Sequence, residues 1–147
     1  MKRRARERLP KRAAGAFPSY LYKSLDELEG PLGDPGFRTG LTDACEALHR
    51  KPLLILSDID LDEALLQRIG LPWVRVLVLL RLRQDPLREG IVGGPGDLLR
   101  NALRLGRAVW NELAVDLEEI AGPLVPTLPQ DEDHAPLHEA WSSWTKS

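Results

Sequence analysis

Apolar residues recur at helical spacing in the segment SDIDLDEALLQRIG, residues 57–70. A serine suited to an N-cap begins the segment, acidic residues fill its first turns, and a glycine closes it. Leucines and isoleucine four residues apart fall on one helical face. We expect an amphipathic helix here. The same spacing is typical of leucine-rich nuclear export segments, so the apolar side is also a candidate partner-binding site: Leu61, Leu65, Ile69 and Leu71.

The segment WVRVLVLLRLR, residues 73–83, fits two structures. Its valines and leucines partly alternate with arginines, as in a half-buried strand. Its many leucines equally suit a buried helix, and Pro72 fits a first helical turn. As a strand it would pair with residues 52–56 in a βαβ unit over residues 52–83, an α/β alternative. We favour the helix because no third strand is visible to complete a sheet.

The longest apolar pattern runs over residues 97–121. Its spacing alternates between four and three residues, which predicts one long helix with a heptad-like seam. So wide an apolar face indicates either the central core helix or a homodimer surface, with Gly106 as the point of close approach. The seam consists of Leu99, Leu103, Gly106, Trp110, Leu113, Leu117 and Ile120.

These patterns predict a mainly α protein, a small helical domain built around one long C-terminal helix, with flexible tails at both ends. A chain of 147 residues has room for one modest core. We expect a basic flexible arm over residues 1–19, a helical domain over 20–122, and a Pro-rich acidic linker with a Trp-containing tail over 123–147. In that tail one helical face could bind a protein partner or fold back on the body: Leu137, Trp141 and Trp144.

Charge is distributed unevenly along the chain. Residues 1–16 hold seven of the 20 basic residues and one of the 22 acidic ones, a formal charge of +6 that leaves −8 for the rest. Such an arm would neutralise phosphates of RNA or DNA, or act as a nuclear address. The candidate nucleic-acid-binding residues of the arm are Lys2, Arg3, Arg4, Arg6, Arg8, Lys11 and Arg12.

A second set of arginines follows the expected long helix. Arg100, Arg104 and Arg107 recur at spacings of four and three and could meet phosphates or an acidic partner. They lie in the half of the helix where the macrodipole favours acidic residues. That placement indicates that a binding partner or a tertiary contact requires arginines there. The alternative is an ordinary solvated helix face.

The acidic cluster after residues 52–56 raises an enzymatic alternative. Asp58, Asp60 and Asp62 could gather around a cation at the end of a strand, but a helix N-terminus prefers the same residues. Cys45 is the only cysteine, and the three histidines lack the spacing of a metal site. We therefore expect no cofactor and no bound metal.

The sequence predicts a non-enzymatic regulatory or accessory protein that binds nucleic acid through its arm and a protein through its helices, with a possible homodimer. A protein-binding adaptor whose arm is a nuclear address is the alternative, and a small metal-dependent enzyme is a more distant one. The longest strictly apolar run is far shorter than the roughly 20 residues of a membrane span. We expect a cytoplasmic protein, nuclear as well in a eukaryotic host.

Overall fold

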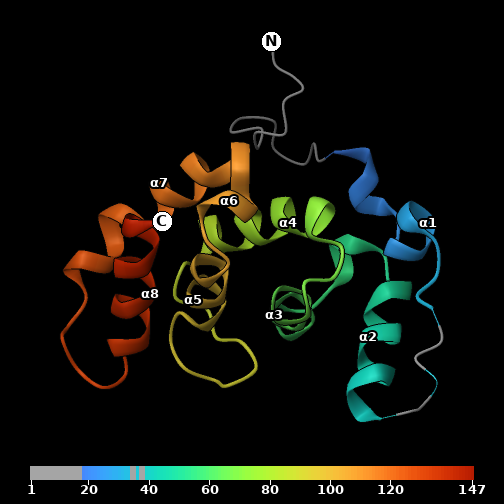
Figure 1. Ribbon diagram of the computed structural model, residues 1–147, viewed down its shortest axis with the longest axis horizontal. Coiled ribbons are helices and arrows are strands. Elements are labelled where there is room, and N and C mark those ends of the chain that lie inside the picture. The colour runs from blue at the N-terminus through green and yellow to red at the C-terminus, as the bar shows by residue number, and fades with distance from the viewer. Residues whose placement is uncertain (1–17, 34–35, 37–38) are drawn as a thin grey trace.

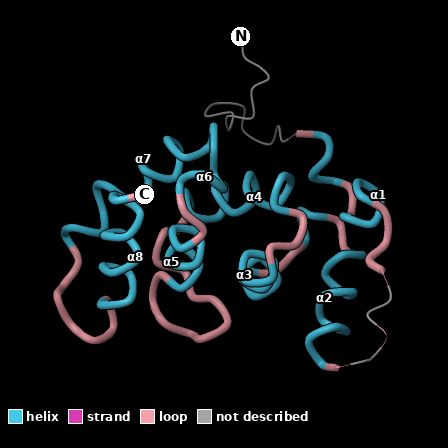
Figure 2. The backbone as a smooth tube through the Cα atoms, in the orientation of Figure 1, coloured by secondary structure: helices cyan, strands magenta, loops and turns pink. Residues whose placement is uncertain are grey.

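The computed structural model describes residues 18–33, 36 and 39–147, and this part of the chain is mainly helical, as expected (Figure 1). No strand occurs in these ranges, apart from a single bridge between Ser24 and Pro52 (Figure 2). The α-helices are α1 (Leu25–Glu29), α2 (Gly40–Arg50), α3 (Asp58–Gln67), α4 (Leu71–Gln84), α5 (Asp97–Arg104), α6 (Arg107–Trp110), α7 (Ala114–Leu124) and α8 (Ala135–Lys146). The described ranges also contain four short 3-10 helices: η1 (Ser19–Tyr22), η2 (Leu53–Ile55), η3 (Asn111–Leu113) and η4 (Val125–Thr127).

Helix α4 lies at the centre of the fold. It packs against α3, α5 and α7, and Figure 1 shows α3 and α5 side by side along one side of it. Its buried residues point in all directions around the helix, which explains why its sequence carried no clear amphipathic period. The α/β alternative is therefore wrong: residues 73–83 belong to α4, and residues 53–55 form η2.

The expected long helix is divided into shorter ones. The chain turns at Gly106, with φ +87° and ψ 158°, and again at Asn111, with φ 52°. The Trp110 indole N–H reaches back to the carbonyl of Ala102 at 2.7 Å. Arg75 of α4 donates to the carbonyls of Val109 and Trp110, at 3.0 and 2.8 Å, and so satisfies groups that a helix end leaves without partners.

The apolar seam nevertheless forms the core. Leu99, Leu103, Trp110, Leu113 and Leu117 are all buried within the described chain. The seam therefore offers no homodimer surface, and Gly106 marks a turn of the chain where nothing approaches closely. The dimer expectation loses its structural basis.

The C-terminal segment, expected as a flexible tail, contains an ordered helix. Helix α8 packs against α5, and the two run side by side in Figure 1. Leu137 and Trp144 are buried, and the Trp144 indole N–H donates to Glu118 of α7 at 3.0 Å. The segment has thus folded back on the body, while the expected boundary at residue 122 stays a prediction.

Reciprocal capping boxes begin α1, α2 and α3. The serine cap predicted at residue 57 is confirmed, and Ser24 caps α1 in the same way; each side chain accepts from the backbone N–H three residues later. Helix α2 is capped by Thr39, and Thr42 completes the box from inside the helix.

The break at Gly106 predicts opposite effects for two matched glycine substitutions. Gly106→Ala should destabilise the fold by about 1–3 kcal/mol, because only glycine adopts this backbone conformation without strain. Gly122→Ala should be neutral or stabilise by up to about 1 kcal/mol, because Gly122 lies inside α7 and an added Cβ would make only ordinary contacts with Trp141. Urea unfolding measures both. Equal stabilisation by the two substitutions would indicate one continuous helix.

Candidate protein-binding surface

The three aspartates of the acidic cluster point to different partners. Asp58 pairs with Arg81 at 2.9 Å and Arg88 at 3.1 Å. Asp60 accepts from Lys51 at 2.9 Å and from the backbone N–H of Ser57 at 3.0 Å. Asp62 turns into the protein. Within the described residues no group of three or more histidines, cysteines or carboxylates could hold a metal ion, and the three aspartates do not converge on one site.

Asp62 joins three segments of the fold. It is fully buried on α3, and its carboxylate accepts from the Asn101 amide of α5 at 2.6 Å. Its other oxygen accepts from the backbone N–H of Ile91 at 2.9 Å. Buried carboxylates are stable only when hydrogen bonds replace their water, so this arrangement holds residues 85–96 firmly against α3 and α5.

Asp97 anchors the same loop from its other end. Its carboxylate is buried at the start of α5 and accepts from the backbone N–H of Gly94 at 2.9 Å. The N–H of Gly90 points to the same oxygen at 3.4 Å, and Arg100 lies 3.1 Å from the second oxygen. The two aspartates thus convert a glycine-rich loop into a fixed part of the surface.

Large apolar side chains are exposed around α3 and this loop. Five of the large exposed apolar residues among the described positions lie here, with exposed fractions between 43% and 76%. Two of them are seven residues apart on α3 and share one face. The hydrogen bond from Ile91 to Asp62 brings the loop beside that helix. We call this set the α3 surface: Ile55, Ile59, Leu66, Ile91 and Val92.

The α3 surface adjoins a cleft of about 190 Å³ between the end of α3 and α5. Two arginines and three leucines line most of it. We call it the arginine cleft, formed by Leu65, Leu66, Arg68, Asn101, Arg104 and Leu105.

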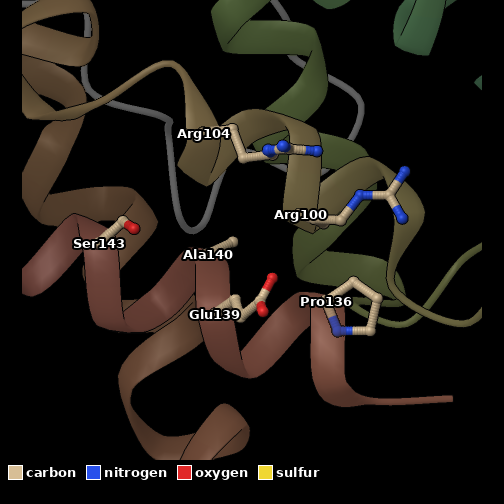
Figure 3. A pocket seen from close by; sticks show the side chains of 6 residues that line it. All are labelled: Arg100, Arg104, Pro136, Glu139, Ala140 and Ser143. Atoms are coloured by element: carbon tan, nitrogen blue, oxygen red, sulfur yellow. The ribbon is translucent and has the colours of Figure 1, made fainter. Parts of the chain in front are cut away.

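Two further clefts lie between α5 and α8. One, of about 130 Å³, contains Arg100 and Arg104 extending from α5 and Glu139 pointing into it from α8 (Figure 3). The other, of about 180 Å³, reaches Val92 and Glu132. Small-molecule sites usually measure about 300–1,000 Å³, so these shallow clefts suit protein side chains better than a cofactor or metabolite.

Most of the predicted partner-binding residues are core residues. Leu61 and Leu65 are buried residues of α3, and Leu137 and Trp144 are buried residues of α8. Almost none of the surface of these four side chains is open to a partner of the folded chain, because their own core covers it. The remaining three are only partly buried and pack against the core: Ile69, Leu71 and Trp141.

The arginine stripe divides into paired and unpaired members. Arg100 is mostly buried beside Asp97, and Arg107 pairs with Glu118 and lies over the Trp144 ring at 5.9 Å. Arg104 is exposed and has no ion pair with any described residue. The predicted arm residues 2–12 lie outside the described residues.

The α3 surface was not predicted from the sequence. The leucine face of residues 57–70 predicted partner binding, whereas the exposed apolar residues of that helix, Ile59 and Leu66, lie off that face. Their position gave a usable signal: two large apolar residues seven apart on the polar side of an amphipathic helix. No pattern in the sequence indicated Ile91 and Val92, because only the fold brings them beside α3.

The described chain is therefore a small helical protein with a surface suited to a protein partner. Residues 33–120 match the family model described as CDI immunity proteins, where CDI denotes contact-dependent inhibition. This match spans more than half of the chain, and the chain belongs to that family. The matched region contains α2 to α6 and most of α7, including the whole α3 surface and the arginine cleft. The chain matches no curated protein and no solved structure.

The family corrects the predicted function. A CDI immunity protein acts on a toxin, so the expected nucleic-acid-binding regulatory protein, its RNA-binding role and its nuclear location are wrong. The expected protein partner agrees with the family. No helix in the described part of the chain is long and apolar enough to cross a membrane.

Asp62 should tolerate even an isosteric change poorly. Asp62→Asn should cost about 2–3 kcal/mol, because the amide brings an N–H donor against the donors of Asn101 or Ile91 and leaves a buried group unsatisfied. Amide hydrogen exchange at residues 90–94 should quicken in the variant. Unchanged stability and exchange would mean that another contact holds the loop.

Asp60 should contribute stability only above acidic pH. Partial burial raises its pKa, but hydrogen bonds from Ser57 and Lys51 and the Lys51 charge outweigh burial and hold the pKa below its ordinary value. A lowered folded-state pKa stabilises the fold above the unfolded pKa of about 3.9, and this stabilisation is lost as the pH falls through the folded value. Asp60→Asn should therefore cost about 1 kcal/mol at pH 7 and progressively less below pH of about 4. Urea unfolding across this range measures the difference; a constant difference would contradict the assignment.

Proposed function

We propose that this chain is an immunity protein that binds a contact-dependent inhibition toxin and neutralises it by forming a complex with it. The observation that carries the proposal is the family match over residues 33–120. Neutralisation requires no catalysis by the chain, because a bound partner can cover a toxin's active site or hold it in an inactive form. We also propose that the complex forms inside the cell that the immunity protein protects.

The surface around α3 supports a binding role. Exposed leucine, isoleucine and valine side chains cost solvation free energy, and a protein interface recovers it when the partner covers them. The loop of residues 85–96 is held by Asp62 and Asp97, so its part of the surface is ordered before binding. A preformed surface loses less conformational entropy on association, which favours tight binding.

Co-expression tests the proposal. Toxin domains of contact-dependent inhibition proteins from the source genome would be induced one at a time in sensitive bacteria, with and without this chain. We expect the chain to restore growth against one of them and to co-purify with it in a 1:1 complex. The matched control is the same toxin co-expressed with an unrelated helical protein of similar size.

Toxin abundance must be measured in the same cells. Rescue with normal toxin levels and a stable complex supports neutralisation by binding. Rescue with loss of the toxin protein, rescue without a complex, or no rescue from any toxin domain would contradict the proposal.

A further inference from the structure

We propose that the arginine cleft receives an acidic side chain of the toxin, with Arg68 and Arg104 as its two binding partners. This inference rests on the proposed function and identifies the place and the chemistry of recognition. The cleft lies between the end of α3 and α5 and is open to solvent at both arginines.

The charges of the cleft favour a carboxylate. Arg68 and Arg104 both line it, and none of its lining residues is acidic. Neither arginine forms an ion pair with a described residue. Both side chains are cationic and line one cleft of about 190 Å³, so a carboxylate bound there would be attracted to two positive charges and could accept hydrogen bonds from both guanidinium groups.

The cleft is also cationic on an otherwise acidic body. Residues 17–147 carry a formal charge of −8, whereas the lining of the arginine cleft contains two arginines and no acidic residue; Glu139 lines the neighbouring cleft on the other side of Arg104. The chain's own arm is an unsuitable occupant, because residues 1–16 carry +6 and would meet like charge. An acidic group from a different molecule fits the cleft better.

Arg68 occupies a backbone position that favours glycine. Its φ of 55° and ψ of 46° are left-handed, and it follows the last helical residue of α3. Its N–H donates to Leu65, while the N–H of Ile69 donates to Ala64 at 2.8 Å. This pair of bonds is the Schellman ending, in which glycine is usual because it has no Cβ. An arginine there carries a local cost that its backbone role does not explain.

Arg104 is positioned by the buried network. It is the last residue of α5, one helical turn after Asn101, whose amide is fixed by Asp62 at 2.6 Å. Leu66 and Leu105 flank the cleft and connect it to the α3 surface. A charged pair with an apolar rim loses water when a partner covers it, and this strengthens the pair.

Substitutions with opposite effects on stability and affinity test the proposal. Arg68→Gly removes the cation and relieves the left-handed backbone, so it should raise the melting temperature while weakening toxin binding at least tenfold. Arg104→Glu should weaken binding at least a hundredfold through repulsion of the acidic group. Calorimetric titration of the full chain with the toxin domain found by the rescue experiment measures both affinities.

The matched control reverses charge elsewhere. Arg50→Glu reverses the charge of another exposed arginine, on α2, which pairs with Glu46, and should change the affinity less than threefold. Similar losses for Arg50→Glu and Arg104→Glu would indicate nonspecific electrostatic attraction and overturn the cleft assignment. Native affinity in both cleft variants would also overturn it.

The outcomes separate this inference from the proposed function. If no toxin domain is neutralised by the wild-type chain, the proposed function fails. If neutralisation occurs and the cleft variants bind normally, only the cleft assignment fails. Self-association of the free chain that Arg104→Glu abolishes would show that a second copy occupies the cleft, and would also overturn the proposal.

Discussion

The buried carboxylate of Asp62 is the constraint on which the candidate surface depends. A single side chain accepts from Asn101 on α5 and from the backbone of Ile91 in the loop, and it does so from within α3. Three segments distant in sequence are therefore held in one arrangement. Removing one partner would leave a buried charge without compensation, so the arrangement forms as a unit. The cleft and the exposed apolar residues around it lie on α3, α5 and the loop, so the hydrogen bonds of Asp62 fix their positions.

The buried network also explains how a short chain can hold the candidate binding surface in a fixed arrangement. Small domains bury little apolar area per residue, and a glycine-rich loop would ordinarily cost much conformational entropy to order. Here Asp62 and Asp97 supply fixed acceptors to the N–H groups of Ile91 and Gly94. Binding would then use a surface that folding has already ordered, which agrees with the proposed neutralisation of a toxin by complex formation.

Local patterns in the sequence were sufficient for the helical class, the N-cap of α3, and the seam as a candidate for the core. These patterns were misleading where tertiary contacts, and not the helical spacing of apolar residues, decide the course of the chain. The heptad-like spacing runs unbroken through Gly106, yet the chain turns there because Trp110 and Arg75 satisfy the groups that the break exposes.

The function could not be predicted from the composition, since the basic arm suggested a phosphate partner. The useful residues on α3, Ile59 and Leu66, were visible as apolar positions on its polar side, whereas the cleft depends on a contact between α3 and α5 that no short-range pattern encodes.

The central claim is that the toxin contacts the α3 surface and the arginine cleft. Hydrogen–deuterium exchange of the full chain, with and without the bound toxin domain, tests it most directly. We expect toxin binding to slow amide exchange at the segments that border the cleft and the loop, which are residues 66–70, 89–94 and 104–106. Protection confined to α2 or to the outer face of α8, with these three segments unchanged, would contradict it.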